Sequence, residues 1–187
     1  MIEVTSGSIT IDGIDIGSIP RSTLCERILC VPQSPELFPG SIRENLDPFS
    51  KCTDEEIIGV LQTVGLWTVI ETRGGLSADA STPLSAGERQ VFALAFAPLR
   101  RKSLQKEGGI LVLDEFSASV DVETERKIMG VVREHFHGWT VLSVSHRLDT
   151  IKDCDLVVVM GAGKVIEVGE PGSLRSVNFE GIGGAEV

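Results

Sequence analysis

The spacing of apolar residues along the chain changes from strict alternation to unbroken runs, and both patterns predict strands. Residues 6–16, SGSITIDGIDI, alternate apolar and polar side chains around Asp12-Gly13, which predicts a β-hairpin near the start of the chain. Unbroken apolar runs are typical of strands that are buried on both faces. The runs in this chain predict strands at 27–33, 110–113, 139–145 and 155–160.

Between these strands, apolar residues recur with the spacing of one helix face. Residues 53–66 form a predicted amphipathic helix, in which Thr53 is the cap and Glu56 completes a capping box. Helices are also predicted at 41–46, from Ser85 onward, at 122–136 and after Pro171, whereas 73–83 is a predicted loop. Helices that alternate with apolar strands imply an α/β fold with a parallel sheet, to which the N-terminal hairpin is an antiparallel attachment.

The segment GAGK at 161–164 has the composition of a phosphate-binding loop but lacks its spacing. A P-loop needs Gly, four residues, Gly-Lys and then Ser or Thr, between a strand and a helix. Here Val158 occupies the position of the first glycine, Val165 follows the lysine, and the next residues have the pattern of a strand. A hairpin turn is therefore the favoured interpretation of this segment.

Composition and charge exclude several classes of protein. The 187 residues are 42% apolar and 24% charged, which is typical of one globular domain with a substantial core. The net charge of −10 argues against a nucleic-acid partner, which needs a basic face. No apolar run approaches the roughly 20 residues of a transmembrane helix, and the N-terminus has no pattern of a signal peptide. The four cysteines are scattered, so we expect reduced structural thiols.

Two adjacent acids follow the apolar run 110–113. Because ligands bind beyond the carboxyl ends of parallel strands, Asp114 and Glu115 lie where a ligand is expected. One carboxylate suits Mg²⁺, and its neighbour can orient or deprotonate a water molecule. A pair of acids in isolation also fits a solvated strand terminus.

Three other features are weak signals when taken singly. In LSAGERQ, residues 84–90, Ser85 caps a predicted helix. The N-terminus of this helix, together with Gly87, suits an anion. A plain capped helix explains the pattern equally well. His146 follows the strand at 139–145 and can donate to a phosphate, but a single histidine is more often structural. Gln33 ends the strand at 27–33 and can reach a metal or a water molecule, or can be a surface side chain.

Taken in order, these motifs resemble the nucleotide-binding domain of ABC transporters. The order is a glutamine after an apolar strand, LSAGERQ, ILVLDE, SASVD and a strand followed by histidine, and the resemblance covers roughly residues 3–174. LFPGSIRENLDPF and SHRLDTI are similar to the C subfamily, the multidrug-resistance-associated type, and to its second nucleotide-binding domain. The resemblance implies a P-loop NTPase-like α/β fold over 1–187, with a helical signature subdomain at about 35–85.

The resemblance also implies a role for each candidate residue. Asp114 matches the Walker B aspartate that holds Mg²⁺, Glu115 matches the catalytic base, and His146 matches the switch histidine that contacts the γ-phosphate of ATP. Gln33 matches the glutamine that contacts Mg²⁺ and water. Ser85 and Gly87 match signature residues that contact an ATP held by a second nucleotide-binding domain, while Ser119 and Asp121 fall in the D-loop. Ala86 and Glu88 depart from the common signature residues but leave Ser85 and Gly87 in place.

The resemblance further implies partners and a location. The partners are transmembrane domains and a second nucleotide-binding domain, at the cytoplasmic face of a membrane into which this chain does not itself insert. ATP and Mg²⁺ are the implied cofactors.

The Walker A pattern Gly-x-x-Gly-x-Gly-Lys-Ser/Thr is not found in these 187 residues. Residues 2–13 resemble the segment that follows the P-loop helix in the family, so the P-loop strand and helix are expected to be absent. In the family the P-loop strand lies between the strand ending near His146 and the strand at 156–160. Without that strand we expect exposed apolar edges, poor stability, weak ATP binding and negligible hydrolysis by the chain alone.

Three interpretations remain open from the sequence. The first is that the sequence is part of an ATPase domain and lacks its N-terminal portion. The second is a non-enzymatic module that lends Ser85 and Gly87 to another domain's ATP, and the third is a degenerate pseudogene product. Pro98 is a further departure from the family pattern, and it predicts either a kinked helix or a helix that ends earlier.

Overall fold

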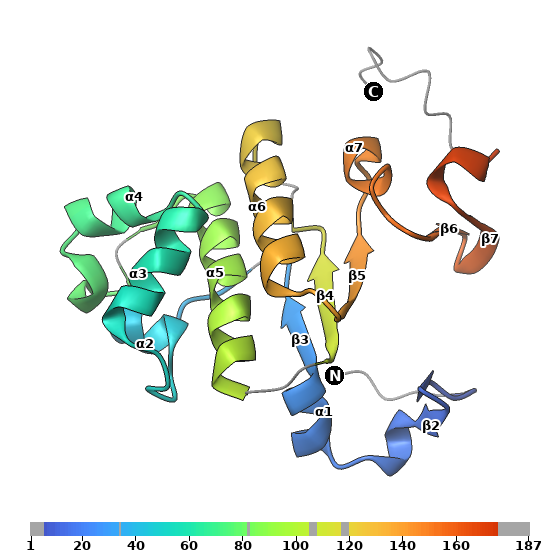
Figure 1. Cartoon of the computed structure of the whole chain (residues 1–187), viewed down its shortest axis with the longest axis horizontal. Coiled ribbons are helices and arrows are strands. Elements are labelled where there is room, and N and C mark those ends of the chain that lie inside the picture. The colour runs from blue at the N-terminus through green and yellow to red at the C-terminus, as the bar shows by residue number, and fades with distance from the viewer. Residues whose placement is uncertain (1–5, 34, 82, 105–107, 117–119, 176–187) are drawn as a thin grey trace. The chain divides into compact units, whose positions relative to one another are not determined.

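The chain forms two compact units, Met1–Val144 and Ser145–Val187. The structure is a computed structural model that describes residues 6–33, 35–81, 83–104, 108–116 and 120–175 (Figure 1). In chain order the first unit contains β1 (Thr10–Ile11), β2 (Ile14–Asp15), η1 (Ile16–Ser18), α1 (Arg21–Arg27), β3 (Ile28–Val31), α2 (Ile42–Leu46), α3 (Asp54–Thr63), α4 (Trp67–Thr72), η2 (Gly75–Ser77), α5 (Ala86–Leu104), β4 (Ile110–Asp114), α6 (Val122–His135) and β5 (Thr140–Val144).

A parallel sheet in the order β3-β4-β5 is the framework of the first unit. Val31 pairs with Leu113 and Asp114 pairs with Val144, so the three strands end at the same edge. Strands 28–31 and 110–114 are joined through helical segments, as a parallel connection requires. The predicted α/β class with a parallel sheet is therefore confirmed.

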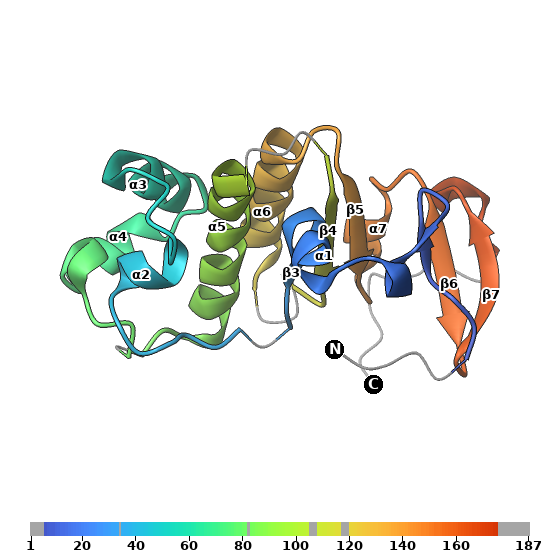
Figure 2. The same cartoon turned by 90° about the horizontal axis from the view of Figure 1, so that it is seen from below.

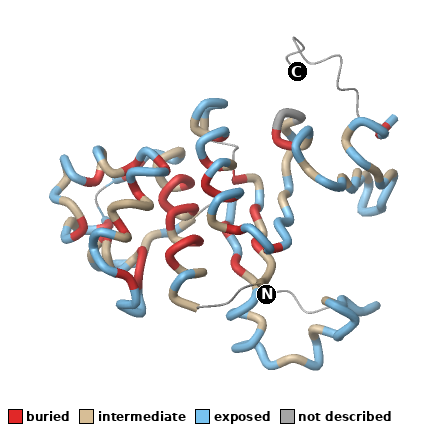
Figure 3. The backbone as a smooth tube through the Cα atoms, viewed as in Figure 1, coloured by how far each residue is buried: buried red, intermediate tan, exposed pale blue. Residues whose placement is uncertain are grey.

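The buried face of this sheet packs against α5 and α6, which lie side by side in Figures 1 and 2. Leu111 and Leu113 alternate with more exposed neighbours on β4 and are fully buried. Ile128 on α6 and Leu94 on α5 are equally inaccessible to water. Figure 3 shows the buried residues concentrated on α5, α6 and the central strands.

Helices α2, α3 and α4 pack with η2 near α5 and form the second part of the core. The predicted capping box of Thr53 with Glu56 is present at the start of α3, and Ser41 with Glu44 forms a second one at the start of α2. Two helices, α1 and α4, were not predicted from the sequence. Both are short and have no side chain that caps the N-terminus, so they lack the usual sequence signal of a helix start.

Helix α5 begins directly after Ser85, as predicted, and continues to Leu104. Pro98 lies inside it and is buried among apolar side chains, so the expectation that the helix ends earlier is wrong. A proline in a helix interior removes one backbone hydrogen bond, but burial of Leu94, Ala95 and Leu99 on the same helix offsets part of that cost.

The two predicted hairpins are both present. In the first unit, Asp12 and Gly13 connect β1 and β2 with φ of 51° and 78°, the left-handed values that a tight hairpin turn requires. In the second unit, β6 (Val157–Gly161) and β7 (Lys164–Gly169) pair antiparallel, with Ala162 and Gly163 in the turn. The interpretation of GAGK as a hairpin is confirmed. The second unit also contains α7 (Leu148–Ile151) and η3 (Pro171–Ser173).

Several apolar side chains on the outer strands remain exposed. On β5, Val141, Leu142 and Val144 are 37%, 57% and 46% exposed. In the described part of the chain β4 is the sole neighbour of β5 within its sheet, so β5 forms an edge. The β6–β7 hairpin likewise exposes Leu156, Val158, Met160, Val165, Ile166 and Val168.

Candidate functional site

The ends of β3 and β4 bring two of the predicted site residues together. Gln33 and Glu115 each lie two residues beyond the paired residues Val31 and Leu113. Because the strands are parallel, both side chains emerge at the same edge of the sheet. The side-chain amide of Gln33 donates a hydrogen bond to Glu115, with 2.5 Å between Nε2 and Oε2.

The backbone at Glu115 turns sharply away from the strand. Its φ is 44°, in the left-handed region that residues other than glycine rarely adopt, at a cost of roughly 1–3 kcal/mol. The backbone N–H of Glu115 donates to the carbonyl oxygen of Val144 at 3.1 Å, which connects the turn to β5.

Asp114 is the last residue of β4 and is exposed. Cys30, which pairs with Val112, lies near it: burial raises the pKa of the Cys30 thiol, and the charge of Asp114 raises it further. Carboxylate and amide oxygens are ligands that Mg²⁺ accepts, together with water and substrate phosphates. Among the described residues no group of three or more His, Cys, Asp or Glu side chains could hold a metal ion.

The start of α5 is a third capping box. The backbone N–H of Ser85 donates to Glu88 Oε2 at 2.6 Å, and the N–H of Glu88 donates to Ser85 Oγ at 3.2 Å. Hydrogen bonding from the Ser85 backbone, with a smaller contribution from Arg73, lowers the pKa of Glu88 below 4.5. Glu88 is therefore ionised at neutral pH, and this capping explains why α5 begins where it does.

Arg73 forms contacts both with the segment that precedes α5 and with the first turn of this helix. Its Nη1 donates to the carbonyl oxygen of Pro83 at 2.9 Å, and its Nη2 lies 3.4 Å from Glu88 Oε1. Gly87 is half-buried in the first turn of α5, where helix N–H groups have no partner within the helix. The positive charge of Arg73 partly neutralises the negative charge of Glu88 next to this turn.

Asp121 caps the next helix. Its Oδ1 accepts hydrogen bonds at 3.0 Å from the backbone N–H groups of Glu123 and Thr124, and its Oδ2 accepts from the Thr124 hydroxyl at 2.7 Å. These hydrogen bonds lower the pKa of Asp121, and the bond from the Thr124 hydroxyl has the largest effect. Asp121 thus has a clear structural role at the start of α6. Ser119, predicted with it, lies outside the described residues.

His146 belongs to the second unit, whereas Gln33, Asp114 and Glu115 lie in the first. It is exposed and follows the last residue of β5 by two positions, the same offset that separates Gln33 from β3.

Two residues at this site were not singled out from the sequence. Gln90 is buried on α5 and donates from Nε2 to the carbonyl oxygen of Gln33 at 3.2 Å. Its signal was present in LSAGERQ, where a polar residue begins the buried face of the helix. Arg73 had no comparable signal, because it lies in a predicted loop.

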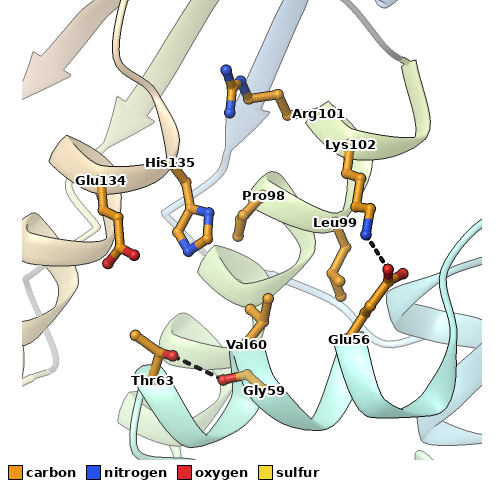
Figure 4. Close-up of a pocket in the computed structure, with 10 residues that line it drawn as sticks. All are labelled: Glu56, Gly59, Val60, Thr63, Pro98, Leu99, Arg101, Lys102, Glu134 and His135. Atoms are coloured by element: carbon orange, nitrogen blue, oxygen red, sulfur yellow. Dashed lines mark hydrogen bonds and ion pairs between the residues drawn. The ribbon is translucent and has the colours of Figure 1, made fainter.

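A surface pocket of about 600 Å³ lies elsewhere in the first unit, between α3, α5 and the end of α6 (Figure 4). Pro98 and Leu99 line it, and Lys102 forms an ion pair with Glu56 at one end. None of the predicted site residues lines this pocket. It is therefore separate from the carboxylates at the sheet edge.

The fold and the residues at the sheet edge define a class of protein, a nucleotide-binding domain of the ABC type. The chain belongs to the ABC transporter family, since the family model described as "ABC transporter" matches residues 1–118. No helix in the described ranges has both the length and the apolar character of a membrane span.

Individual relatives support the same assignment. The chain is 47% identical over 177 residues to "ABC multidrug transporter B" of Aspergillus fumigatus, which covers 94% of this chain and 12% of that protein. It is 42% identical over 180 residues to "ATP-binding cassette sub-family C member 2" of Rattus norvegicus, and 41% identical over 181 residues to the protein of that name of Homo sapiens. These matches cover 94% and 95% of this chain and 11% of each relative. The chain thus spans about an eighth of the length of these relatives or less.

Proposed function

We propose that this chain is part of the ATP-hydrolysing domain of an exporter of the C subfamily, corresponding to the second nucleotide-binding domain. In this proposal residues of about 35–85 form its helical signature subdomain. The partners are transmembrane domains and another nucleotide-binding domain, at the cytoplasmic face of a membrane. Membership of the ABC transporter family and the two C-subfamily relatives support the assignment.

The catalytic part of the proposal rests on Glu115, with Gln33 beside it. Glu115 accepts the proton of the attacking water, because its carboxylate is held at the edge of the sheet by the Gln33 amide. Catalysis of phosphoryl transfer depends mainly on positioning and on charge stabilisation, so a base in a defined position is the central requirement. The contact between Gln33 and Glu115 is the observation that carries the proposal.

The cofactor in this proposal is ATP with Mg²⁺, for which Asp114 and the Gln33 amide oxygen provide ligands. Bound Mg²⁺ supplies charge neutralisation on the phosphate oxygens. His146 donates a hydrogen bond to the γ-phosphate, and Asp121 lies beside the nucleotide in the D-loop.

Ser85 and Gly87 contact an ATP held by the opposite domain. The Ser85 hydroxyl accepts from Glu88 and still has its own hydrogen to donate.

The phosphate cradle of this site is expected from residues outside these 187. The exposed apolar side chains at the β5 edge support this, because such an edge normally pairs with another strand. A P-loop strand beside β5 would cover Leu142 and Val144 and would bring its phosphate-binding loop to the edge that carries Glu115. The chain alone is therefore expected to bind ATP weakly and to hydrolyse it negligibly.

The genomic sequence upstream of the Met1 codon provides the first test. An in-frame Gly-x-x-Gly-x-Gly-Lys-Ser/Thr, with membrane spans further upstream, supports the proposal. In the protein encoded by that reading frame, Glu115→Gln should lower ATP hydrolysis by at least about 100-fold and leave ATP binding intact. The matched control is Glu71→Gln, a change of the same type at an exposed position on α4. Undiminished hydrolysis by the Glu115→Gln protein would refute the assignment of the base.

A second candidate is a non-enzymatic module that lends its signature residues to another domain. The Ser85–Glu88 cap favours it, because hydrogen bonds within this segment hold the Ser85 side chain at the start of α5. This candidate predicts that the 187-residue chain raises ATP hydrolysis by a P-loop-bearing partner domain and that Ser85→Ala abolishes the increase. An equal increase with Glu115→Gln separates it from the enzymatic proposal.

A further inference from the structure

Glutamine 90 is an unusual residue for its position. It is 5% exposed and lies on the face of α5 that otherwise buries Val91, Leu94 and Ala95. An apolar side chain would fill this volume without the cost of burying an amide, which is offset only when the amide is hydrogen-bonded. Its Nε2 donates to the carbonyl oxygen of Gln33, 3.2 Å away.

The carbonyl that Gln90 contacts lies beyond the end of β3. The ladder between β3 and β4 ends at Val31 and Leu113, and Pro32 follows, whose nitrogen has no hydrogen to donate. Gln33 is exposed, so packing does not restrict its side chain strongly. The hydrogen bond from α5 therefore restrains the backbone from which the Gln33 side chain extends.

At its other end, the Gln33 side chain donates to Glu115 at 2.5 Å. Glu115 is itself held in a left-handed backbone conformation, with φ of 44°. A small shift of the Gln33 backbone would lengthen this bond, because hydrogen bonds weaken steeply with distance and angle. Two consecutive hydrogen bonds thus connect a residue of α5 to the Glu115 carboxylate.

We propose that Gln90 is a positioning residue that fixes the Gln33 backbone, so that the Gln33 amide holds the Glu115 carboxylate in place. The catalytic meaning of this contact rests on the proposed function, in which Glu115 is the base. The chain of two hydrogen bonds from Gln90 to Glu115 does not depend on that function. Gln90 acts through Gln33 and is not a catalytic residue.

Nuclear magnetic resonance of the side-chain amides tests this proposal directly. The chain has four glutamines, Gln33, Gln62, Gln90 and Gln105, so labelling with ¹⁵N-glutamine gives a small set of amide pairs that single substitutions assign. Glu115→Ala removes the acceptor and defines the shift of the Gln33 pair when its bond is lost. Gln90→Met keeps the approximate shape and removes the donor. Gln62→Met, an exposed change on α3, is the matched control.

We expect Gln90→Met to change the chemical shifts of the Gln33 amide pair in the same direction as Glu115→Ala and to a similar extent. Gln62→Met should leave these shifts unchanged. If Gln90→Met prevents folding, Gln90→Leu provides the same test, because it has a similar volume and no group that can donate. An unchanged Gln33 pair in a folded Gln90 variant overturns the proposal. A Gln33 pair that is also insensitive to Glu115→Ala overturns it.

The measurement uses no nucleotide, so it is independent of the proposed function. If the Gln33 pair shifts as expected but Glu115→Gln retains full hydrolysis, the positioning role stands and the assignment of the base fails. If both hold, Gln90→Met in the longer protein used for the Glu115→Gln test should lower the kcat for ATP by about tenfold or more with little change in KM, because misplaced catalytic groups reduce the chemical step.

Discussion

Gly109 provides the sharpest test of the packing that holds β4. It lies immediately before β4, and its carbonyl accepts a hydrogen bond from the N–H of Thr140 at 3.0 Å. A Cβ added at Gly109 would lie 2.5 Å from the carbonyl oxygen of Arg27 and 2.7 Å from Cζ3 of Trp139. Both neighbours are constrained, since Arg27 directly precedes β3 and the Trp139 ring is 8% exposed.

The magnitude follows from two opposing effects of Gly109→Ala. Loss of backbone freedom in the unfolded chain would stabilise the fold by about 0.4–1 kcal/mol. Overpacking against a backbone carbonyl and a buried ring costs about 1–3 kcal/mol, and contacts below 3.0 Å indicate the upper part of that range. The expected net loss in the free energy of unfolding is about 2 kcal/mol.

The matched control is the neighbouring glycine. A Cβ added at Gly108 meets no atom closer than the carbonyl oxygen of Gly138, at 3.9 Å. Gly108→Ala should therefore change the free energy of unfolding by less than about 1 kcal/mol. Urea unfolding followed by circular dichroism and by the fluorescence of Trp67 and Trp139 measures both variants. With an m-value of about 2 kcal/mol per molar, Gly109→Ala should lower the midpoint by about 1 M. Equal midpoints for the two variants would refute this account of the packing.

Two other predictions concern pH and the exposed strand. Because the folded-state pKa of Glu88 lies below its ordinary value of 4.5, its contribution to stability is present above that value and is lost as pH falls through the folded-state pKa. Urea midpoints from about pH 7 to about pH 3 should therefore fall less for Glu88→Gln than for the unchanged chain, and an identical fall would contradict the assignment. Leu142→Thr, at a side chain 57% exposed on β5, should reduce self-association in sedimentation velocity and change stability by less than about 0.5 kcal/mol. Leu111→Thr, at a fully buried position of β4, is its control and should lose several kcal/mol, so similar losses for both would be inconsistent with an exposed β5 edge.

Much of the fold was predictable because its signals are local. The hairpin at Asp12-Gly13, the capping boxes at Ser41, Thr53 and Ser85, and the apolar strand 110–113 each depend on a few adjacent residues. Helices α1 and α4 were missed, because short helices without capping side chains depend on packing for their stability. At Pro98 the sequence left open whether α5 continues with a kink or ends earlier, and the structure shows that the helix continues.

The candidate site was predictable as a set of residue types but not as a set of contacts. A strand that ends in Asp114 and Glu115 indicates a ligand edge, because parallel strands present their carboxyl ends together. Nothing in the sequence indicates that Glu115 adopts a left-handed backbone conformation or that the Gln33 amide reaches its carboxylate.

The sequence by itself determined the family, the order of the strands and of most helices along the chain, and the residues that can carry the chemistry. These properties follow from local patterns, which a chain expresses before any distant contact forms. Only the tertiary structure decided which of these residues meet. Gln33, Gln90 and Glu115 are separated by tens of residues in the chain, and the parallel pairing of β3 with β4 under helix α5 brings them together. The physical reason is that strand register and helix packing are determined by burial of the whole apolar core, a sum over many distant residues that no short segment contains.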